Sequence, residues 1–144
     1  MKIRLDYVTN SSSSSYLIAY KKLPEFDDET LHKYPFLEYY GNIIEKVLFT
    51  EGDYDTAAGE VFRTKEEYDT YIVAEYGWRD KNTVEKILED DDYFVGTYNE
   101  AIKYLEKGFN ILEKCVDYSD SFCHNIIRAL AADRENFVIL EDGN

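Results

Sequence analysis

Apolar and polar residues alternate in short blocks along the chain, and the spacing within each block predicts strands or helices. In 2–8 every second residue is apolar, and 16–20 is a more continuously apolar block. Both patterns are typical of strands, and the second indicates an interior strand. Three further blocks, 59–63, 109–116 and 137–140, also have strand character, and we expect 137–140 to lie at the centre of a sheet.

Helical spacing fills most of the remaining chain. Thr64 and Glu67 form one capping box, and Thr97 and Glu100 form a second. The apolar residues that follow each predicted start recur every three or four positions, as on one face of a helix. Residues 47–50 can end one of these helices or form a strand of their own. The predicted helix starts are Asp27 or Asp28, Pro35, Thr64, Asn82, Thr97, and Ser119 or Asp120.

These elements predict one α+β domain spanning residues 1–144. We expect a mixed sheet of about five or six short strands, with four to six helices packed on it. Residues 1–22 would form a strand, a loop and a strand. Residues 97–141 would form a helix–strand–helix–strand unit, whose two strands we expect to pair in parallel.

The charge narrows the possible partners. The chain has 16 basic and 30 acidic residues, and its net charge is −14. This charge disfavours direct contact with nucleic acid or with an anionic membrane, because both require a basic surface. No apolar run is long enough to span a membrane, and the first residues do not resemble a signal peptide. We therefore expect a cytoplasmic protein of a bacterial host cell.

The acidic residues are clustered. Residues 1–22 carry four basic residues and one acidic residue, so nearly all the negative charge follows them. Two clusters lie beside tyrosines, and this composition is typical of protein contacts. The run at 89–92 also follows a predicted helix, where negative charge opposes the helix dipole. The sequence therefore predicts a partner-binding surface formed by Glu51, Asp53, Tyr54, Asp55, Glu89, Asp90, Asp91, Asp92 and Tyr93.

No pattern indicates a metal site, a cofactor or a catalytic residue. Cys115, Cys123 and His124 lack the spacing of zinc ligands, and the two cysteines are interpreted as small apolar residues without a disulfide. The acidic segment that begins at Glu51 fails the calcium-loop pattern, because Thr56 and Phe62 occupy the positions of the required Gly and Glu.

A run of five serines follows Val8-Thr9-Asn10 and precedes Tyr16. We expect this run to be a polar loop between two strands. A modification or processing site at Ser11, Ser12, Ser13, Ser14 or Ser15 is an alternative. The first 16 residues resemble the start shared by many small proteins of clostridia-type bacteria and their phages. The resemblance implies a phage or mobile-element setting and carries over no functional residue.

Three hypotheses about function follow. The first is a non-enzymatic protein-binding module with a basic partner, since clustered carboxylates attract a cationic surface. In a phage setting it would inhibit a host nucleic-acid-binding factor by imitating DNA, as anti-CRISPR and anti-restriction proteins do. The second is an accessory or structural phage-type component that acts by self-association. The third is an enzyme, which would need a concave pocket where carboxylates and tyrosine hydroxyls converge.

Overall fold

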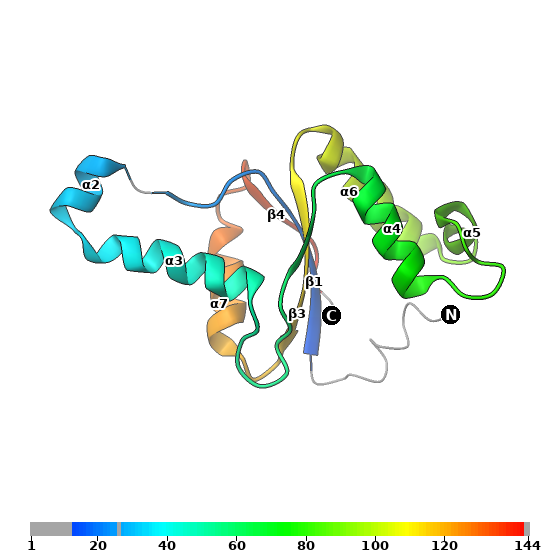
Figure 1. The fold of residues 1–144 in the computed structure, drawn as a ribbon, viewed down its shortest axis with the longest axis horizontal. Coiled ribbons are helices and arrows are strands. Elements are labelled where there is room, and N and C mark those ends of the chain that lie inside the picture. Colours follow the sequence, from blue (N-terminus) through cyan, green and yellow to red (C-terminus); the bar gives the residue numbers. More distant parts are fainter. Residues whose placement is uncertain (1–12, 26, 143–144) are drawn as a thin grey trace.

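One antiparallel sheet with helices on both faces makes up residues 13–25 and 27–142, the part of the chain that this computed structural model describes (Figure 1). The strands are β1 (Ser13–Tyr20), β2 (Glu60–Phe62), β3 (Asn110–Asp117) and β4 (Phe137–Glu141). The helices are α2 (Asp28–Lys33), α3 (Phe36–Phe49), α4 (Lys65–Tyr76), α5 (Val84–Leu88), α6 (Asp92–Glu106) and α7 (Ser121–Leu130). The α+β class and the number of helices confirm the prediction.

The sheet itself differs from the prediction. Its order is β2-β3-β1-β4, and every neighbouring pair is antiparallel, so the expected mixed sheet of five or six strands is wrong for the described residues. The predicted strand at 2–8 lies outside them. Because β1 runs antiparallel to both β3 and β4, these two strands point the same way but do not pair. The expected parallel pair is therefore split by β1, and β4 lies at the edge rather than at the centre.

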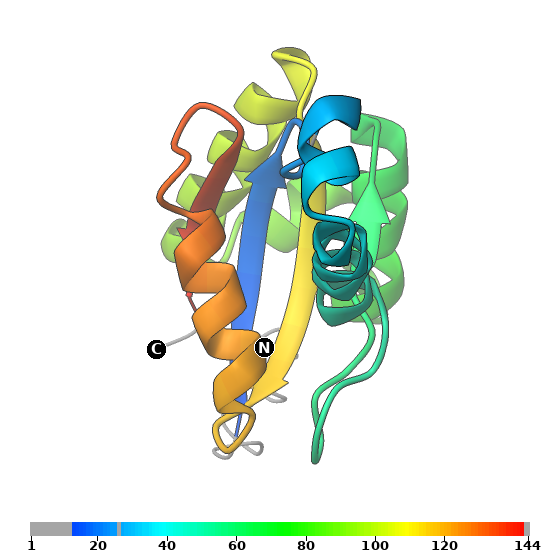
Figure 2. The same cartoon turned by 90° about the vertical axis from the view of Figure 1, so that its left-hand side faces the viewer.

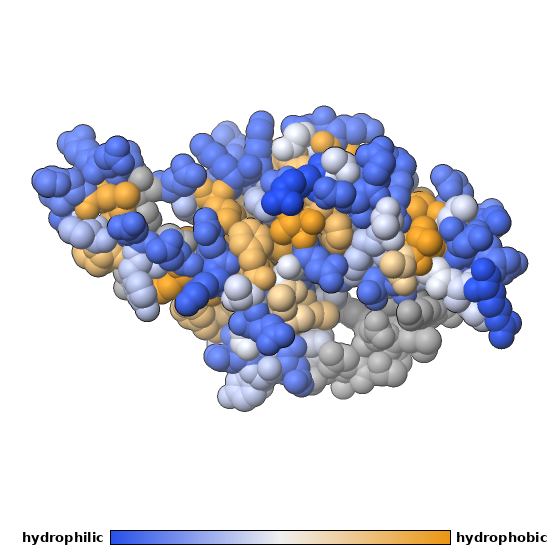
Figure 3. Space-filling view, viewed as in Figure 1, coloured by the Kyte–Doolittle hydropathy of each residue, from blue (hydrophilic) through white to orange (hydrophobic). Residues whose placement is uncertain are grey.

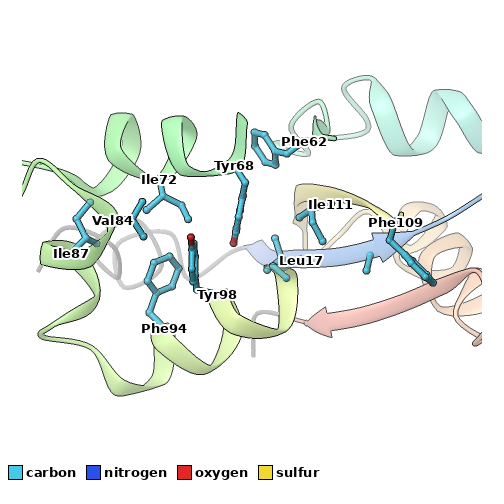
Figure 4. Packing of buried hydrophobic residues seen from close by; sticks show 12 residues of the cluster. Leu17, Phe62, Tyr68, Ile72, Val84, Ile87, Phe94, Tyr98, Phe109 and Ile111 are labelled. Carbon is cyan, nitrogen blue, oxygen red and sulfur yellow. The ribbon is translucent and has the colours of Figure 1, made fainter. Parts of the chain in front are cut away.

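Side chains that alternate along β1 enter two separate cores. Leu17 and Ala19 face α4, α5 and α6, where aromatic residues fill the space between helices and sheet. Figure 4 shows Tyr68 of α4 beside Tyr98 of α6, and their rings stack with centroids 5.9 Å apart. Tyr68 is almost fully buried in this core.

The other face of the sheet packs against α3 and α7. Tyr16 and Ile18 of β1 lie there with Leu48 of α3 and Ile127 of α7, and all four are buried. Figure 2 shows α7 and α3 in front of β1 and β3. In Figure 1, α2 and the first half of α3 extend beyond the sheet. The molecule therefore has three layers, with α3 and α7 on one side and α4, α5 and α6 on the other.

Two helices begin at the predicted capping residues, whose side chains accept from backbone N–H groups three residues later. The carboxylate of Asp27 accepts from the N–H of Thr30, and the hydroxyl of Thr64 accepts from the N–H of Glu67. The side chain of Glu67 reaches the N–H of Arg63, completing an arrangement close to a capping box.

Three predicted element boundaries differ from those in the structure. Thr97 is inside α6, which begins five residues earlier at Asp92, so the second capping box is wrong. Thr83 rather than Asn82 caps α5. Residues 47–49 belong to α3, so the strand alternative for 47–50 is also wrong, and β2 pairs with β3 instead.

Candidate functional site

The loop after α3 is held against the turn between β3 and α7. The N–H of Asp53 donates to Oδ2 of Asp120 at 3.1 Å, and the N–H of Asp55 donates to Oδ2 of Asp117 at 3.4 Å. The buried hydroxyl of Thr56 accepts from the N–H of Asp117 at 3.0 Å. Since both aspartates are buried, these bonds fix the loop to the body of the protein.

The fixed loop exposes an aromatic side chain at its tip. Tyr54 is 75% exposed, and its backbone has φ 56°, a left-handed conformation that costs a non-glycine residue about 1 kcal/mol or more. Two more aromatic residues, Tyr118 and Phe122, are about half exposed on the adjoining turn and on the first turn of α7.

We call this region the loop–turn surface, which comprises Glu51, Asp53, Tyr54, Asp55, Tyr118 and Phe122. A groove of about 280 Å³ runs beside it between α3 and α7. Phe122 lines that groove together with Glu51, Asp53 and one lysine, Lys46. The surface thus combines exposed aromatic rings with three exposed carboxylates.

The second predicted acidic segment lies elsewhere, in the connection between α5 and α6. Those helices pack on the opposite face of the sheet from α3 and α7. In Figure 1 the connection is near the far end of the α4–α6 layer, away from the loop after α3. The structure therefore does not bring the two predicted segments together.

Residues 89–92 form ion pairs with Lys81 and cap the start of α6. Lys81 places its Nζ 2.7 Å from Oδ2 of Asp90 and 3.7 Å from Oε2 of Glu89, and the bond to Asp90 raises the pKa of Lys81. Asp91 caps α6 by accepting from the N–H of Phe94, and Asp92 lies in the first turn of that helix. The charge that opposes the dipole of α5 therefore favours the start of α6. Tyr93 is exposed beside it.

The serine run is not a loop in its described part. Ser13, Ser14 and Ser15 are the first residues of β1, and Ser13 and Ser14 are buried. Their burial removes the exposure on which a modification or processing site depends. Ser11 and Ser12 lie outside the described residues, so for them that role stays a prediction.

A buried polar network surrounds His124. The Nε2 of His124 lies 3.0 Å from the backbone oxygen of Asp117, which can only accept, so Nε2 carries the proton. The other ring nitrogen, Nδ1, therefore accepts from the hydroxyl of Tyr16 at 2.7 Å. Neighbouring Cys123 is a buried free thiol, and burial raises its pKa to about 11. In the described part of the chain, no group of three or more His, Cys, Asp or Glu could hold a metal ion.

A second feature, missed from the sequence, is a small pocket between the sheet and helices α4 and α6. We call it the carboxylate–tyrosine pocket, because its lining includes Glu113, Glu141, Tyr68, Tyr71 and Tyr76. Its volume is about 40 Å³, room for about three water-sized groups. Carboxylates and tyrosines converge here, as the enzyme hypothesis requires, but the pocket is smaller than an ordinary small-molecule site of about 300–1,000 Å³.

Glu113 is the central group of the carboxylate–tyrosine pocket. The hydroxyl of Tyr71 donates to its Oε1, and burial raises its pKa from an ordinary 4.5 to about 7. The carboxylates of Glu60, Glu75 and Glu141 raise it further, against the effect of the Tyr71 hydrogen bond. Burial, followed by the charge of Glu113, also raises the pKa of Tyr71 above its ordinary range. This carboxyl therefore changes charge near neutral pH.

Comparison with known proteins found no similar protein. No family model, no curated protein and no solved structure matches the chain. No helix within the described ranges is both long and apolar enough to cross a membrane.

Proposed function

We propose that this chain is a non-enzymatic protein-binding module that recognises its partner through the loop–turn surface. The observation that carries the proposal is Tyr54, an exposed aromatic residue held in a left-handed conformation by a loop bonded to two buried aspartates. Backbone strain is found where a function requires a particular geometry, and exposed aromatic residues supply much of the energy of protein contacts.

The charge supports a partner with basic side chains. Glu51, Asp53 and Asp55 surround Tyr54, and their combined field would attract and orient a cationic surface. Phe122 and the groove between α3 and α7 would take the apolar side chains of that partner. The proposal does not extend to imitation of DNA, because the second acidic segment lies on the opposite layer and pairs with Lys81.

Capture from a bacterial extract tests this proposal with matched variants. The wild-type chain, Tyr54→Ala and Tyr93→Ala are immobilised, and the bound proteins are identified and quantified. We expect a basic protein that binds the wild type and Tyr93→Ala equally, and that Tyr54→Ala retains at about one-thirtieth of the affinity, since a central aromatic contact contributes about 2 kcal/mol. Equal capture by all three chains, or capture by none, would contradict the proposal.

Self-association is a second candidate function, favoured by the arm that α2 and α3 form. Phe36 is 59% and Tyr39 is 67% exposed on this arm, and Figure 3 shows apolar side chains at the surface over it. A groove of about 650 Å³ on α3 includes Tyr39, Ile43 and Phe49 in its lining. Sedimentation at high and low salt tests this function. A defined dimer that persists at low salt and is lost in Tyr39→Ser would support it, whereas a dimer that weakens at low salt would indicate an accidental contact and a monomer under both conditions would exclude this function.

A further inference from the structure

We propose that Lys114 is a positioning residue for the loop–turn surface, holding from inside the protein the loop conformation that presents Tyr54. This inference rests on the function proposed above and names a side chain on which its binding surface depends. Lys114 lies on β3 and is completely buried. Its Nζ donates to the backbone oxygen of Thr50 at 2.7 Å, and Thr50 is the residue at which α3 ends and the loop begins.

A lysine is unusual at this position of β3. Leu112 and Val116 stand two residues before and after it on the same face of the strand, and both are fully buried in the core against α3 and α7. An apolar side chain there would gain free energy by burial, whereas an ammonium group loses its hydration. Burial accordingly lowers the pKa of Lys114, against the effect of Cys123 and Asp120. The one hydrogen bond that its Nζ makes to a described residue goes to the loop, and this contact explains the lysine.

The loop lies between buried charges of opposite sign. Its first carbonyl, that of Thr50, faces the ammonium of Lys114, and three residues later the N–H of Asp53 donates to the carboxylate of Asp120. A carbonyl oxygen is attracted to a cation and an N–H to an anion, so the two contacts fix the direction of the backbone that leads to Tyr54. Removing the ammonium would release the start of the loop and take away a cation near Asp120, which is itself buried.

The conformation that these contacts hold is a strained one. Tyr54 has φ 56°, which a non-glycine residue rarely adopts unless the surrounding structure imposes it. With Thr50 released, we expect the loop to populate conformations in which φ of Tyr54 is negative. Partner affinity would then fall in proportion to the fraction of molecules that keep the binding conformation.

Substitution of Lys114 by Met tests the proposal, with Lys46→Met as the matched control. Met keeps an unbranched side chain but has no donor for Thr50, and Lys46 is an exposed lysine in the lining of the neighbouring groove. NMR of the free chains measures amide exchange, and a strong Overhauser contact between the amide and Hα protons of Tyr54 reports its positive φ. In Lys114→Met we expect amides 53 and 55 to exchange about tenfold faster and this contact to weaken, because a hydrogen bond from a charged donor is lost. Amides of the β1–β3 ladder should stay within about twofold, and Lys46→Met should match the wild type.

The outcomes separate a positioning role from a general structural one. If Lys114 only supported the fold, amides of the loop and of the β1–β3 ladder would exchange faster together. That result, or unchanged exchange at 53 and 55, would overturn the proposal whether or not a partner is found. Affinity for the captured partner should fall about tenfold in Lys114→Met. A released loop with unchanged affinity would support the positioning of the loop by Lys114 and contradict the function proposed for the surface.

A measurement on the wild type covers the case in which Lys114→Met does not fold. The ammonium protons of an exposed lysine exchange with water too fast to be observed, whereas those of a buried and hydrogen-bonded lysine exchange slowly. We expect a slowly exchanging lysine ammonium signal with an Overhauser contact to the backbone of Thr50. The absence of that signal would overturn the proposal.

Discussion

Replacing Glu113 by Gln should stabilise the protein at pH 8 and leave its stability nearly unchanged at pH 4. In the folded chain burial raises the pKa of Glu113 to about 7, from an ordinary value of 4.5 that applies when the chain is unfolded. Between these two values the folded state holds a proton that the unfolded state releases. Raising the pH through this window therefore favours unfolding, so the contribution of Glu113 to stability falls from about pH 4.5 to about pH 7 and is constant above it.

The expected size follows from the same two values. A tenfold difference in proton affinity corresponds to about 1.4 kcal/mol, so the shift to about 7 corresponds to about 3 kcal/mol. Because Glu113 is only partly enclosed and the pocket admits water, we expect a gain of about 2 kcal/mol for Glu113→Gln at pH 8. The Tyr71 hydroxyl would still have an acceptor, the amide oxygen.

Urea unfolding followed by circular dichroism at several pH values between 4 and 8 measures this effect. The difference in the free energy of unfolding between Glu113→Gln and the wild type should grow between about pH 4.5 and 7 and then remain constant. Glu60→Gln, its exposed cross-strand neighbour, is the matched control and should show a much smaller change. A difference between Glu113→Gln and the wild type that does not depend on pH would refute the reasoning.

Three other substitutions test the strained loop tip, the hydrogen bond to His124 and the close backbone approach at Gly59. Tyr54→Gly should leave the free energy of unfolding unchanged or raise it by up to about 1 kcal/mol, because glycine adopts φ 56° without strain, while partner binding measured by calorimetry falls. Tyr16→Phe should lower the melting temperature and cost about 1–2 kcal/mol, because Nδ1 of His124 then has no donor. Gly59→Ala should cost about 1–3 kcal/mol in urea unfolding, since its Cβ would lie 2.2 Å from the backbone oxygen of Leu48.

Local features of the fold were predictable from the sequence, and pairing between distant segments was not. The caps at Asp27, Thr64 and Asp120 depend on contacts three residues away, so the sequence around each one specifies it. The position of β1 between β3 and β4 depends on residues about 100 positions apart. No hydrophobic pattern within one strand indicates which neighbours it will have, and the predicted parallel pair failed for that reason.

The candidate sites also had a part that was predictable from local sequence and a part that depends on distant segments. The acidic loop at 51–55 is predicted as a surface from the sequence, but Phe122 is not part of that prediction. In the structure Cys123 and His124 lie on the buried face of α7, and Phe122 is 54% exposed beside the loop. Glu113 did leave a signal, since it stands between Ile111 and Cys115 on one face of β3. A charge at such a position indicates a buried ionisable group, although its partners come from α4 and β4.

Hydrogen exchange of the chain with and without its captured basic partner tests whether the partner binds the loop–turn surface. Amides at 51–55 and 118–122 should exchange more slowly in the complex, because the loop–turn surface is the proposed contact. Amides at 89–93 should be unchanged and serve as the internal control, since that segment lies on the opposite layer. Slower exchange at 89–93 with no change at 51–55 would contradict the account.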